Sequence, residues 1–241
     1  MLSKWKTFYL REMMTPSILG LWINPFYILR RSLWKHLRDL ARPLSGQRLL
    51  DVGCGSKPYE ALFQVEEYLG TDIAVSGHDH TTSKVDFFYD GTTLPLEANS
   101  IDIVFSSEVF EHVFELDNLL REIHRVLKSD GSFLFTAPFF WGEHEQPYDY
   151  ARYTSFAWQD LLQRHGFEVV ESRKSVRDFA AIVQLEIGYI FQHILPKQKL
   201  IRLVFTPFLI APLTILGLIL GRIAPAPGEI YANNIFLAKK R

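Results

Sequence analysis

The sequence predicts an α/β fold with a doubly wound, mostly parallel sheet. Two observations lead to this prediction. The central half of the 241-residue chain alternates short apolar runs with segments of helical periodicity, which is typical of parallel strands covered by helices. The first run leads directly into a turn with two glycines, in the stretch LLDVGCG. A hydrophobic content of 48% suits one substantial domain with a real core.

The apolar runs define six strands, and two amphipathic helices lie among them. The predicted strands are residues 48–53, 66–73, 84–90, 100–107, 131–138 and 167–172. Residues 116–131 place Leu116, Leu119, Leu120, Ile123 and Leu127 on one helical face and end at a glycine turn. Residues 153–166 start at a Thr/Ser cap and stop at Gly166.

Charge and cysteine content limit the partners and the compartment. A formal net charge of −1 gives no overall basic field, so nucleic acid is not expected as a partner. The single cysteine, Cys54, excludes an internal disulfide and fits a reducing compartment. Charged residues interrupt every apolar run in residues 1–17, so no signal peptide is expected there. We therefore expect a cytoplasmic protein.

Acidic residues and glycines follow the predicted strands at the edge where such sheets bind ligands. Gly53 and Gly55 would let a ligand approach the backbone, although an ordinary tight turn would also use them. A dinucleotide fingerprint would need a third glycine where the chain has Pro58, so a nicotinamide or flavin site fits poorly. Asp72 and Asp90 end the next two strands; each alone could cap a turn, but together they suggest an adenosine pocket.

Residues 49–174 resemble a class I S-adenosylmethionine-dependent methyltransferase of the type 11 or ubiquinone-biosynthesis group. The matching segments, in order, are LLDVGCGSKPYE, LGTDI, DGTTLPLEANSIDIVFSSEVFEHV, LLREIHRVLKSDGSFLFTAPF and TSFAWQDLLQRHGFEVV. Lys57 and Pro58 depart from the glycine-rich end of the usual first motif, and KSDG replaces a commoner Lys-Pro-Gly-Gly turn.

The resemblance implies a seven-stranded, Rossmann-like sheet whose last strand, residues 231–240, is antiparallel. It also implies S-adenosylmethionine as cofactor. Asp51 would lie near the amino group of this cofactor, Asp72 would bind the ribose, and Ile73 would pack on the adenine. The full set of implied cofactor-binding residues is Asp51, Gly53, Cys54, Gly55, Asp72, Ile73, Asp90, Gly91 and Ser107.

A second group of residues suggests how a methyl acceptor could be activated. If residues 106–113 formed a helix, Glu108, Glu111 and His112 would share one face, and His144 should return to the same rim. Glu108, Glu111, His112 and His144 could bind a divalent metal such as Mg²⁺ or Zn²⁺, as the resemblance also implies. Without a metal, His144 or His112 is the expected general base. The acids could instead favour a helix dipole, with His112 merely packed.

The segment between the last two strands is unusually apolar. Residues 203–221 carry no charge and are flanked by Lys197, Lys199, Arg202 and Arg222, so they qualify by length as a membrane span. A single crossing would separate the last strand from its sheet. We therefore expect a hairpin with residues 179–195 or a helical lid, with helices broken at Pro207 and Pro212.

Three regions follow from these patterns. Residues 1–46 form a basic, aromatic helical region, with eight Lys or Arg against two acids, as at a lipid surface. Residues 47–176 with 229–241 form the methyltransferase domain, and residues 177–228 form the hydrophobic insertion. If residues 1–46 were instead a lid over the active site, this would explain their aromatic residues but not their excess of Lys and Arg over acids.

The sequence therefore favours a methyltransferase, most simply an O-methyltransferase, at the cytoplasmic face of a membrane. Its acceptor would be a small or lipid-linked molecule such as a quinol or saccharide precursor, and aromatic residues of 139–153 could line its pocket. Alternatives are methyl transfer to carbon or nitrogen, or a non-catalytic membrane adaptor. The sequence leaves the oligomeric state open.

Overall fold

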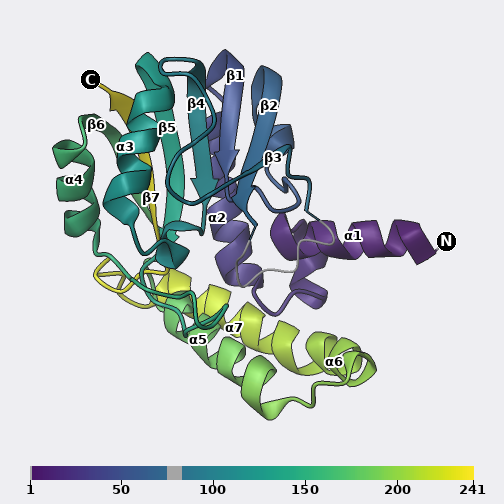
Figure 1. The fold of residues 1–241 in the computed structure, drawn as a ribbon. Helices are drawn as coiled ribbons and strands as arrows, with labels where there is room; N and C mark the ends of the chain where they lie inside the picture. Colours follow the sequence, from purple (N-terminus) through teal and green to yellow (C-terminus); the bar gives the residue numbers. More distant parts are fainter. Residues whose placement is uncertain (1, 75–82) are drawn as a thin grey trace. The chain divides into compact units, whose positions relative to one another are not determined.

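The computed structural model describes residues 2–74 and 83–241 (Figure 1). The chain divides into two compact units. Unit 1 comprises residues 1–36 and 174–232 and is mainly helical, whereas unit 2 comprises residues 37–173 and 233–241 and holds most of the sheet. Helix α2 (Tyr27–Ala41) and strand β6 (Phe167–Ser175) cross the boundary between the units.

One seven-stranded sheet has the order β3-β2-β1-β4-β5-β7-β6. Its other strands are β1 (Ser45–Val52), β2 (Gln64–Ile73), β3 (Phe87–Tyr89), β4 (Ile101–Ser107), β5 (Leu127–Pro138) and β7 (Asn233–Lys240). Strands β1 to β5 pair in parallel, and β7 runs antiparallel to β5. The predicted fold class is thereby confirmed. The strand order reverses between β1 and β4, so the carboxyl ends of these neighbours form the switch point where α/β sheets bind ligands.

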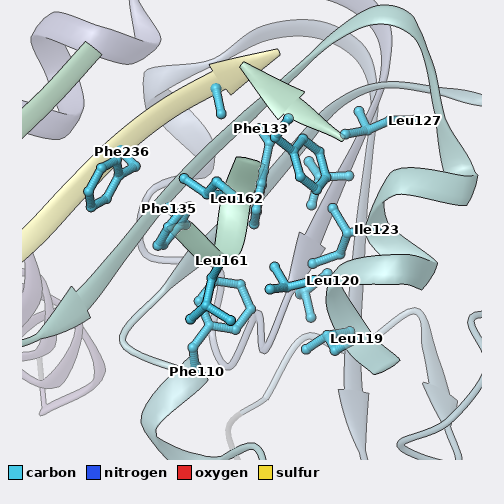
Figure 2. Packing of buried hydrophobic residues seen from close by; sticks show 14 of the residues in the cluster. Phe110, Leu119, Leu120, Ile123, Leu127, Phe133, Phe135, Leu161, Leu162 and Phe236 are labelled. Carbon is cyan, nitrogen blue, oxygen red and sulfur yellow. The ribbon is translucent and has the colours of Figure 1, made fainter. Parts of the chain in front are cut away.

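The core of unit 2 lies between the sheet and two helices, α3 (Leu116–Val126) and α4 (Ser155–Arg164). Figure 2 shows apolar side chains of both helices turned toward the phenylalanines of β5. The residues labelled there are Phe110, Leu119, Leu120, Ile123, Leu127, Phe133, Phe135, Leu161, Leu162 and Phe236. The predicted amphipathic face of 116–126 is therefore the face that packs on the sheet.

Helix α4 has the predicted caps, but α3 ends earlier than predicted. The Thr154 side chain accepts a hydrogen bond from the Ala157 N–H, and Gly166 follows α4 with φ of +79°. Helix α3 ends at Val126, because buried Leu127 already pairs with Ile101 at the start of β5. Helical periodicity does not reveal this cross-strand partner.

Unit 1 contains a helical hairpin. Helix α5 (Ala180–Tyr189) continues as the π-helix η5 (Ile190–Ile194); the chain then turns into α6 (Lys199–Phe205), the π-helix η6 (Thr206–Ile210) and α7 (Ala211–Ile223). Helices α5 and α7 contact each other. A Cβ at Gly217 would lie 2.8 Å from the Val183 Cγ1, so this glycine permits the close contact. The expected apolar helix before the last strand is thus present, and it pairs with α5 inside unit 1.

The N-terminal part of unit 1 packs with this hairpin. It consists of α1 (Leu2–Met14), the 3₁₀ helix η1 (Ile18–Trp22) and the first part of α2. The buried amide of Gln184 donates to the Pro25 carbonyl and accepts from the Leu29 N–H, which joins α5 to the start of α2. Glu12, buried, accepts hydrogen bonds from the N–H and the hydroxyl of Ser17.

The apolar arm of the hairpin is one continuous helix, contrary to the expected break at the prolines. Residues Leu200–Ile223 are long and apolar enough to cross a membrane by length and composition, and only 28% of the most apolar part is buried. Pro207 lies in the first turn of η6, where the wider π-helical turn accommodates its ring. The Thr206 hydroxyl donates to the Arg202 carbonyl at 2.7 Å across this turn.

Replacing Phe135 by alanine should lower the free energy of unfolding by about 3 to 5 kcal/mol. Its fully buried ring packs against Phe110, Trp158 and Phe236, with centroid distances of 5.1, 4.8 and 5.5 Å. The matched control is Phe156→Ala on α4, which should change stability by less than about 0.5 kcal/mol because this ring is exposed. Urea unfolding followed by circular dichroism measures both, and equal losses would contradict the described core.

Candidate active site

The turn after β1 has the conformation that its glycines predict. Gly53 has φ of +73° and Gly55 has φ of +48°. A Cβ at Gly53 would lie 2.3 Å from the Val109 Cγ2, so a side chain is excluded there. Among the described residues, none lies within 4 Å of where a Cβ at Gly55 would stand, so they leave this side of the turn open to a ligand.

Asp51, at the end of β1, is a buried acid with an unusual pKa. Its carboxylate accepts a hydrogen bond from the Tyr68 hydroxyl at 2.7 Å. Burial raises the pKa of Asp51 to about 7, and the nearby Asp72 carboxylate adds to the rise. A cationic ligand at this edge would therefore stabilise the charged form of Asp51. Tyr68 was not predicted as a site residue, because a tyrosine inside a strand is most simply a packing residue.

Lys57 fixes the glycine turn to β2 and to the segment before β3. It has φ of +54°, and its Nζ lies at hydrogen-bonding distance from the Asp86 carboxylate and 3.1 Å from the Tyr68 carbonyl oxygen. Asp86 also accepts from the Gly70 N–H at 2.6 Å. At this position the chain departs from a glycine-rich motif, and the side chain of Lys57 is buried and pairs with the Asp86 carboxylate.

The other predicted cofactor residues lie along the same edge. Asp72, at the end of β2, is buried and accepts from the Ile73 N–H at 2.8 Å. Asp90 is exposed and accepts from the N–H groups of Thr92 and Thr93, which lower the pKa of Asp90 to about 2. Gly91 has φ of +82°, and a Cβ there would lie 3.9 Å from the Ile73 Cγ2.

Cys54 and Ser107 flank this edge from β1 and β4. The Cys54 thiol is buried, and burial raises its pKa to about 12, so it is a neutral thiol at physiological pH. The Ser107 hydroxyl lies 2.9 Å from the Thr136 hydroxyl on β5. The Cys54 thiol is therefore not an activated nucleophile.

The segment after β4 does not form an α-helix. A helix over residues 106–113, which the sequence suggests, would have placed Glu108, Glu111 and His112 on one face. Glu108 has φ of +56°, and Phe110–His112 form a single 3₁₀ turn, η4. The Glu108 carboxylate accepts from the Thr136 hydroxyl at 2.8 Å and from the Asn233 amide at 2.6 Å. These partners on β5 and β7 hold Glu108 in a left-handed conformation, which no local pattern shows.

Glu111, His112 and His144 come together without the helix. One ligand atom from each lies within 4.8 Å of the others. The distances are 3.7 Å from the His112 Nε2 to the Glu111 Oε1 and 3.9 Å from the His144 Nε2 to the same oxygen. Glu108 lies outside this group of three. The loop from β5 to α4 thus brings His144 to the same rim, as predicted.

A backbone carbonyl lies beside the Nδ1 of each histidine. The His112 Nδ1 lies 2.8 Å from the Tyr148 carbonyl oxygen, and the His144 Nδ1 lies 3.2 Å from the Gly142 carbonyl oxygen. Because a carbonyl only accepts, a neutral His112 carries its proton on Nδ1 and directs the lone pair of Nε2 toward Glu111. The His144 Nδ1 also lies 3.2 Å from the Asp149 carboxylate and 3.5 Å from the Arg152 guanidinium, so the Gly142 carbonyl is not its only polar neighbour.

This cluster is short of hydrogen-bond partners. Among the described residues, both Glu111 carboxylate oxygens and the His112 Nε2 are buried without a hydrogen bond. Burial, and next the Glu108 carboxylate, raise the pKa of Glu111 well above its usual range. Burial and the neighbouring His112 lower the pKa of His144. A bound cation or a proton would relieve this arrangement.

Asp149 and Arg152 hold the loop that carries His144. Asp149 accepts from the His144 backbone N–H at 2.9 Å and from the Arg152 guanidinium at 2.7 Å. Although burial acts in the opposite direction, these bonds lower the pKa of Asp149 to about 2. The sequence showed both residues only as part of a mixed polar loop, because their pairing depends on how the loop folds back.

Aromatic residues of the same loop divide between the core and the surface. Tyr153 packs on buried Trp158 at 5.3 Å between centroids. Phe114 and Tyr150 form an exposed edge-to-face pair at 5.3 Å, and the Tyr150 N–H donates to the Glu111 carbonyl. An exposed aromatic pair therefore lies next to the Glu111 cluster, where an apolar or ring-containing molecule could bind.

Residues 50–135 match a family described as a methyltransferase domain. The region extends from the buried part of β1 through the Glu111 turn into β5, and so includes the glycine turn and both acidic strand ends. The strand order and the antiparallel last strand agree with this match. The chain carries a class I S-adenosylmethionine-dependent methyltransferase domain.

Curated relatives of this methyltransferase domain have several activities in their names. A ubiquinone biosynthesis O-methyltransferase of Ruegeria pomeroyi is 35% identical over 44% of this chain and 47% of its own length. A ubiquinone/menaquinone biosynthesis C-methyltransferase of Rubrivivax gelatinosus is 32% identical over 45% of this chain and 48% of its own. A mitochondrial arginine-hydroxylase of Danio rerio is 39% identical over 40% of this chain and 32% of its own. The chain spans about half the length, or less, of these relatives.

Among solved structures, a Haemonchus contortus phosphoethanolamine N-methyltransferase in complex with S-adenosyl-L-methionine has the same fold. The TM-score is 0.55 at 19% identity, over 93% of this chain and 57% of that one. At this identity the likeness concerns the fold.

Proposed function

We propose that the chain is an S-adenosylmethionine-dependent methyltransferase that acts on a hydroxyl group. The observation that carries the proposal is the contact between Gly53 and Val109. It places the glycine turn of the cofactor edge directly against the segment that carries Glu111 and His112. A methyl donor on one side and an acceptor-activating cluster on the other would then be neighbours, as an in-line displacement requires.

The residues of the cofactor edge fit S-adenosylmethionine. This cofactor supplies an electrophilic methyl group on a positively charged sulfur. Two buried carboxylates, Asp51 and Asp72, form a negative edge, and the nearby Lys57 is already paired with Asp86. The open side of Gly55 leaves room for a ligand against the backbone. Asp51 would pair with the cofactor's ammonium group, and Asp72 would accept hydrogen bonds from ribose hydroxyls.

The Glu111 cluster fits either a divalent cation or a proton. Glu111, His112 and His144 offer one carboxylate and two imidazole lone pairs, a donor set that suits Zn²⁺ better than Mg²⁺. When bound, such an ion would lower the pKa of an acceptor hydroxyl. Without it, the Nε2 of His112 or His144 would take the hydroxyl proton as the oxygen bonds to the methyl carbon, and the methyl–sulfur bond of the cofactor would break to release the demethylated product. Arg152 and Asp149 keep His144 in place in both cases.

We further propose that the acceptor is apolar or lipid-linked, of the quinol-like or saccharide-precursor class, and that the reaction takes place at the cytoplasmic face of a membrane. The exposed Phe114–Tyr150 pair and the little-buried apolar helix of unit 1 support an apolar acceptor. Methyl transfer to carbon remains the second candidate, because one curated relative is named as a C-methyltransferase. A non-catalytic adaptor would not need the two buried acids.

Replacing Asp72 by alanine should weaken the binding of S-adenosylmethionine by about tenfold or more, because a charged acceptor for the ribose hydroxyls is lost. Isothermal titration calorimetry with S-adenosylmethionine and its demethylated product measures this. Asp160→Ala, an exposed acid on α4, is the matched control and should bind as the unaltered protein does. Binding by neither protein would refute the proposed cofactor, whereas an unchanged affinity of Asp72→Ala would remove only this residue from the site.

The affinity for S-adenosylmethionine should rise by about one order of magnitude between pH 5.5 and 7.5. The raised pKa of Asp51, about 7, means that its carboxylate becomes ionised only as the pH passes through this range, and a cationic ligand pairs with the ionised form. Asp51→Asn should bind more weakly at pH 7.5 and should lose most of this pH dependence. Parallel pH curves for the two proteins would show that Asp51 does not face the cofactor.

Replacing Glu111 by glutamine should abolish the binding of Zn²⁺ while leaving the affinity for S-adenosylmethionine unchanged. The substitution keeps the shape of the side chain and removes the anionic ligand. Glu115→Gln, an exposed acid nearby in the chain, is the control. Metal titrations followed by calorimetry distinguish the two mechanisms: if the unaltered protein binds neither Zn²⁺ nor Mg²⁺ and retains activity with chelator, proton transfer to His112 or His144 is favoured.

A further inference from the structure

The two compact units carry opposite charges, which the net charge of −1 conceals. Unit 1 has twelve Lys or Arg against four Asp or Glu, a formal charge of +8. Unit 2 has fourteen Lys or Arg against twenty-three Asp or Glu, a formal charge of −9. A unit with this excess of base attracts anionic surfaces over the distance of a Debye length.

Unit 1 also exposes large apolar side chains along the hairpin. One side of α7 is closed, since Ala211, Thr214 and Gly217 are buried. The other sides of α5 to α7 expose Tyr189, Ile194, Leu200, Leu203, Val204, Phe205, Phe208, Leu216, Ile219 and Ile223. Soluble monomers rarely expose so many large apolar residues on successive helices, so this surface is a docking surface.

A second exposed apolar group lies in α1 and η1 of the same unit. It consists of Trp5, Tyr9, Leu10, Ile18, Leu19 and Trp22. Lys4 and Lys6, both exposed, alternate with Trp5, and η1 contacts both η6 and α7. Tryptophan and tyrosine beside lysine are the residues favoured at the interface between lipid headgroups and acyl chains.

The hairpin is suited to lie in the plane of a bilayer surface. Its α5–η5 arm has fifteen residues, or about 22 Å of helix, which is shorter than the apolar thickness of a bilayer. This arm also carries the exposed acid Glu186, which is costly inside a bilayer and suits a helix at its surface. Exposed Lys197 lies at the turn and Arg222 at the far end of the apolar helix, so both ends could reach lipid phosphates while the apolar side faces the acyl chains.

We propose that unit 1 docks on an anionic lipid bilayer, with the α5–α7 hairpin in the plane of the interface and Lys197 and Arg222 at the phosphates. The proposal extends the apolar acceptor proposed above, but it depends on unit 1 alone. Vesicle binding requires no methyl transfer, so its failure and the failure of the enzymatic proposal are distinguishable.

The test is flotation of the full chain with vesicles of phosphatidylcholine, with and without roughly 30 mol % phosphatidylglycerol. The protein should float with the anionic vesicles, and binding should fall with added salt. Phe208→Glu should reduce the partition coefficient by about tenfold or more. The matched control is Phe156→Glu on unit 2, because the two rings are almost equally exposed, at 79% and 78%. Circular dichroism verifies that both variants fold.

The contribution of basic residues to vesicle binding is tested separately. Lys197→Glu should lower binding to anionic vesicles by about fivefold or more, whereas Arg121→Glu on α3 of unit 2 should leave it unchanged. Equal binding to both kinds of vesicle, or equal losses for Phe208→Glu and Phe156→Glu, would overturn the proposal. Resistance to extraction at alkaline pH would show a span instead of an in-plane hairpin. A stable dimer that does not float would show that a second copy covers this surface.

Discussion

The candidate site depends on the close approach of the Gly53 backbone to Val109. Strands β1 and β4 are parallel neighbours at the switch point of the sheet, so the segments that follow them meet at one edge. The approach requires the absence of a side chain at Gly53 and the left-handed conformation of Glu108. Bonds from Thr136 and Asn233 stabilise Glu108, so β5 and the antiparallel β7 support the site as well. The last strand therefore serves the site in addition to completing the sheet.

Electrostatics divide this edge into two regions with different requirements. Around the glycine turn, burial raises the pKa of Asp51, the nearby Asp72 carboxylate adds to the rise, and the neighbouring Lys57 is held by Asp86, so a cationic ligand is favoured. Around Glu111, both carboxylate oxygens and the His112 Nε2 are buried without a hydrogen bond among the described residues, so a cation or a transferable proton is favoured. A sulfonium methyl donor beside an acceptor hydroxyl would satisfy both regions. The two regions differ in chemistry and adjoin where the Gly53 backbone approaches Val109.

The distribution of charge gives the two units different physical roles. Unit 2 combines the sheet, the acids and the polar cluster, whereas unit 1 combines basic residues with exposed apolar helices. Desolvating an apolar face releases free energy in proportion to its area, and basic residues add an attraction that is specific for anionic lipids. The proposed action on a lipid-linked acceptor would use both properties in one chain.

Local patterns determined the strands, the helix that stops just before Gly166, the apolar helix before the last strand and the acids at the strand ends. These features rest on periodicity, capping and hydrophobicity, which act over a few residues. Only the tertiary structure decided the end of α3, the pairing of Lys57 with Asp86, the bond between Asp51 and Tyr68, and the left-handed Glu108. It also replaced a supposed helical face by a cluster of Glu111, His112 and His144. Each of these depends on a partner that is distant in sequence, because burial and cross-strand hydrogen bonds override the local preference of the chain.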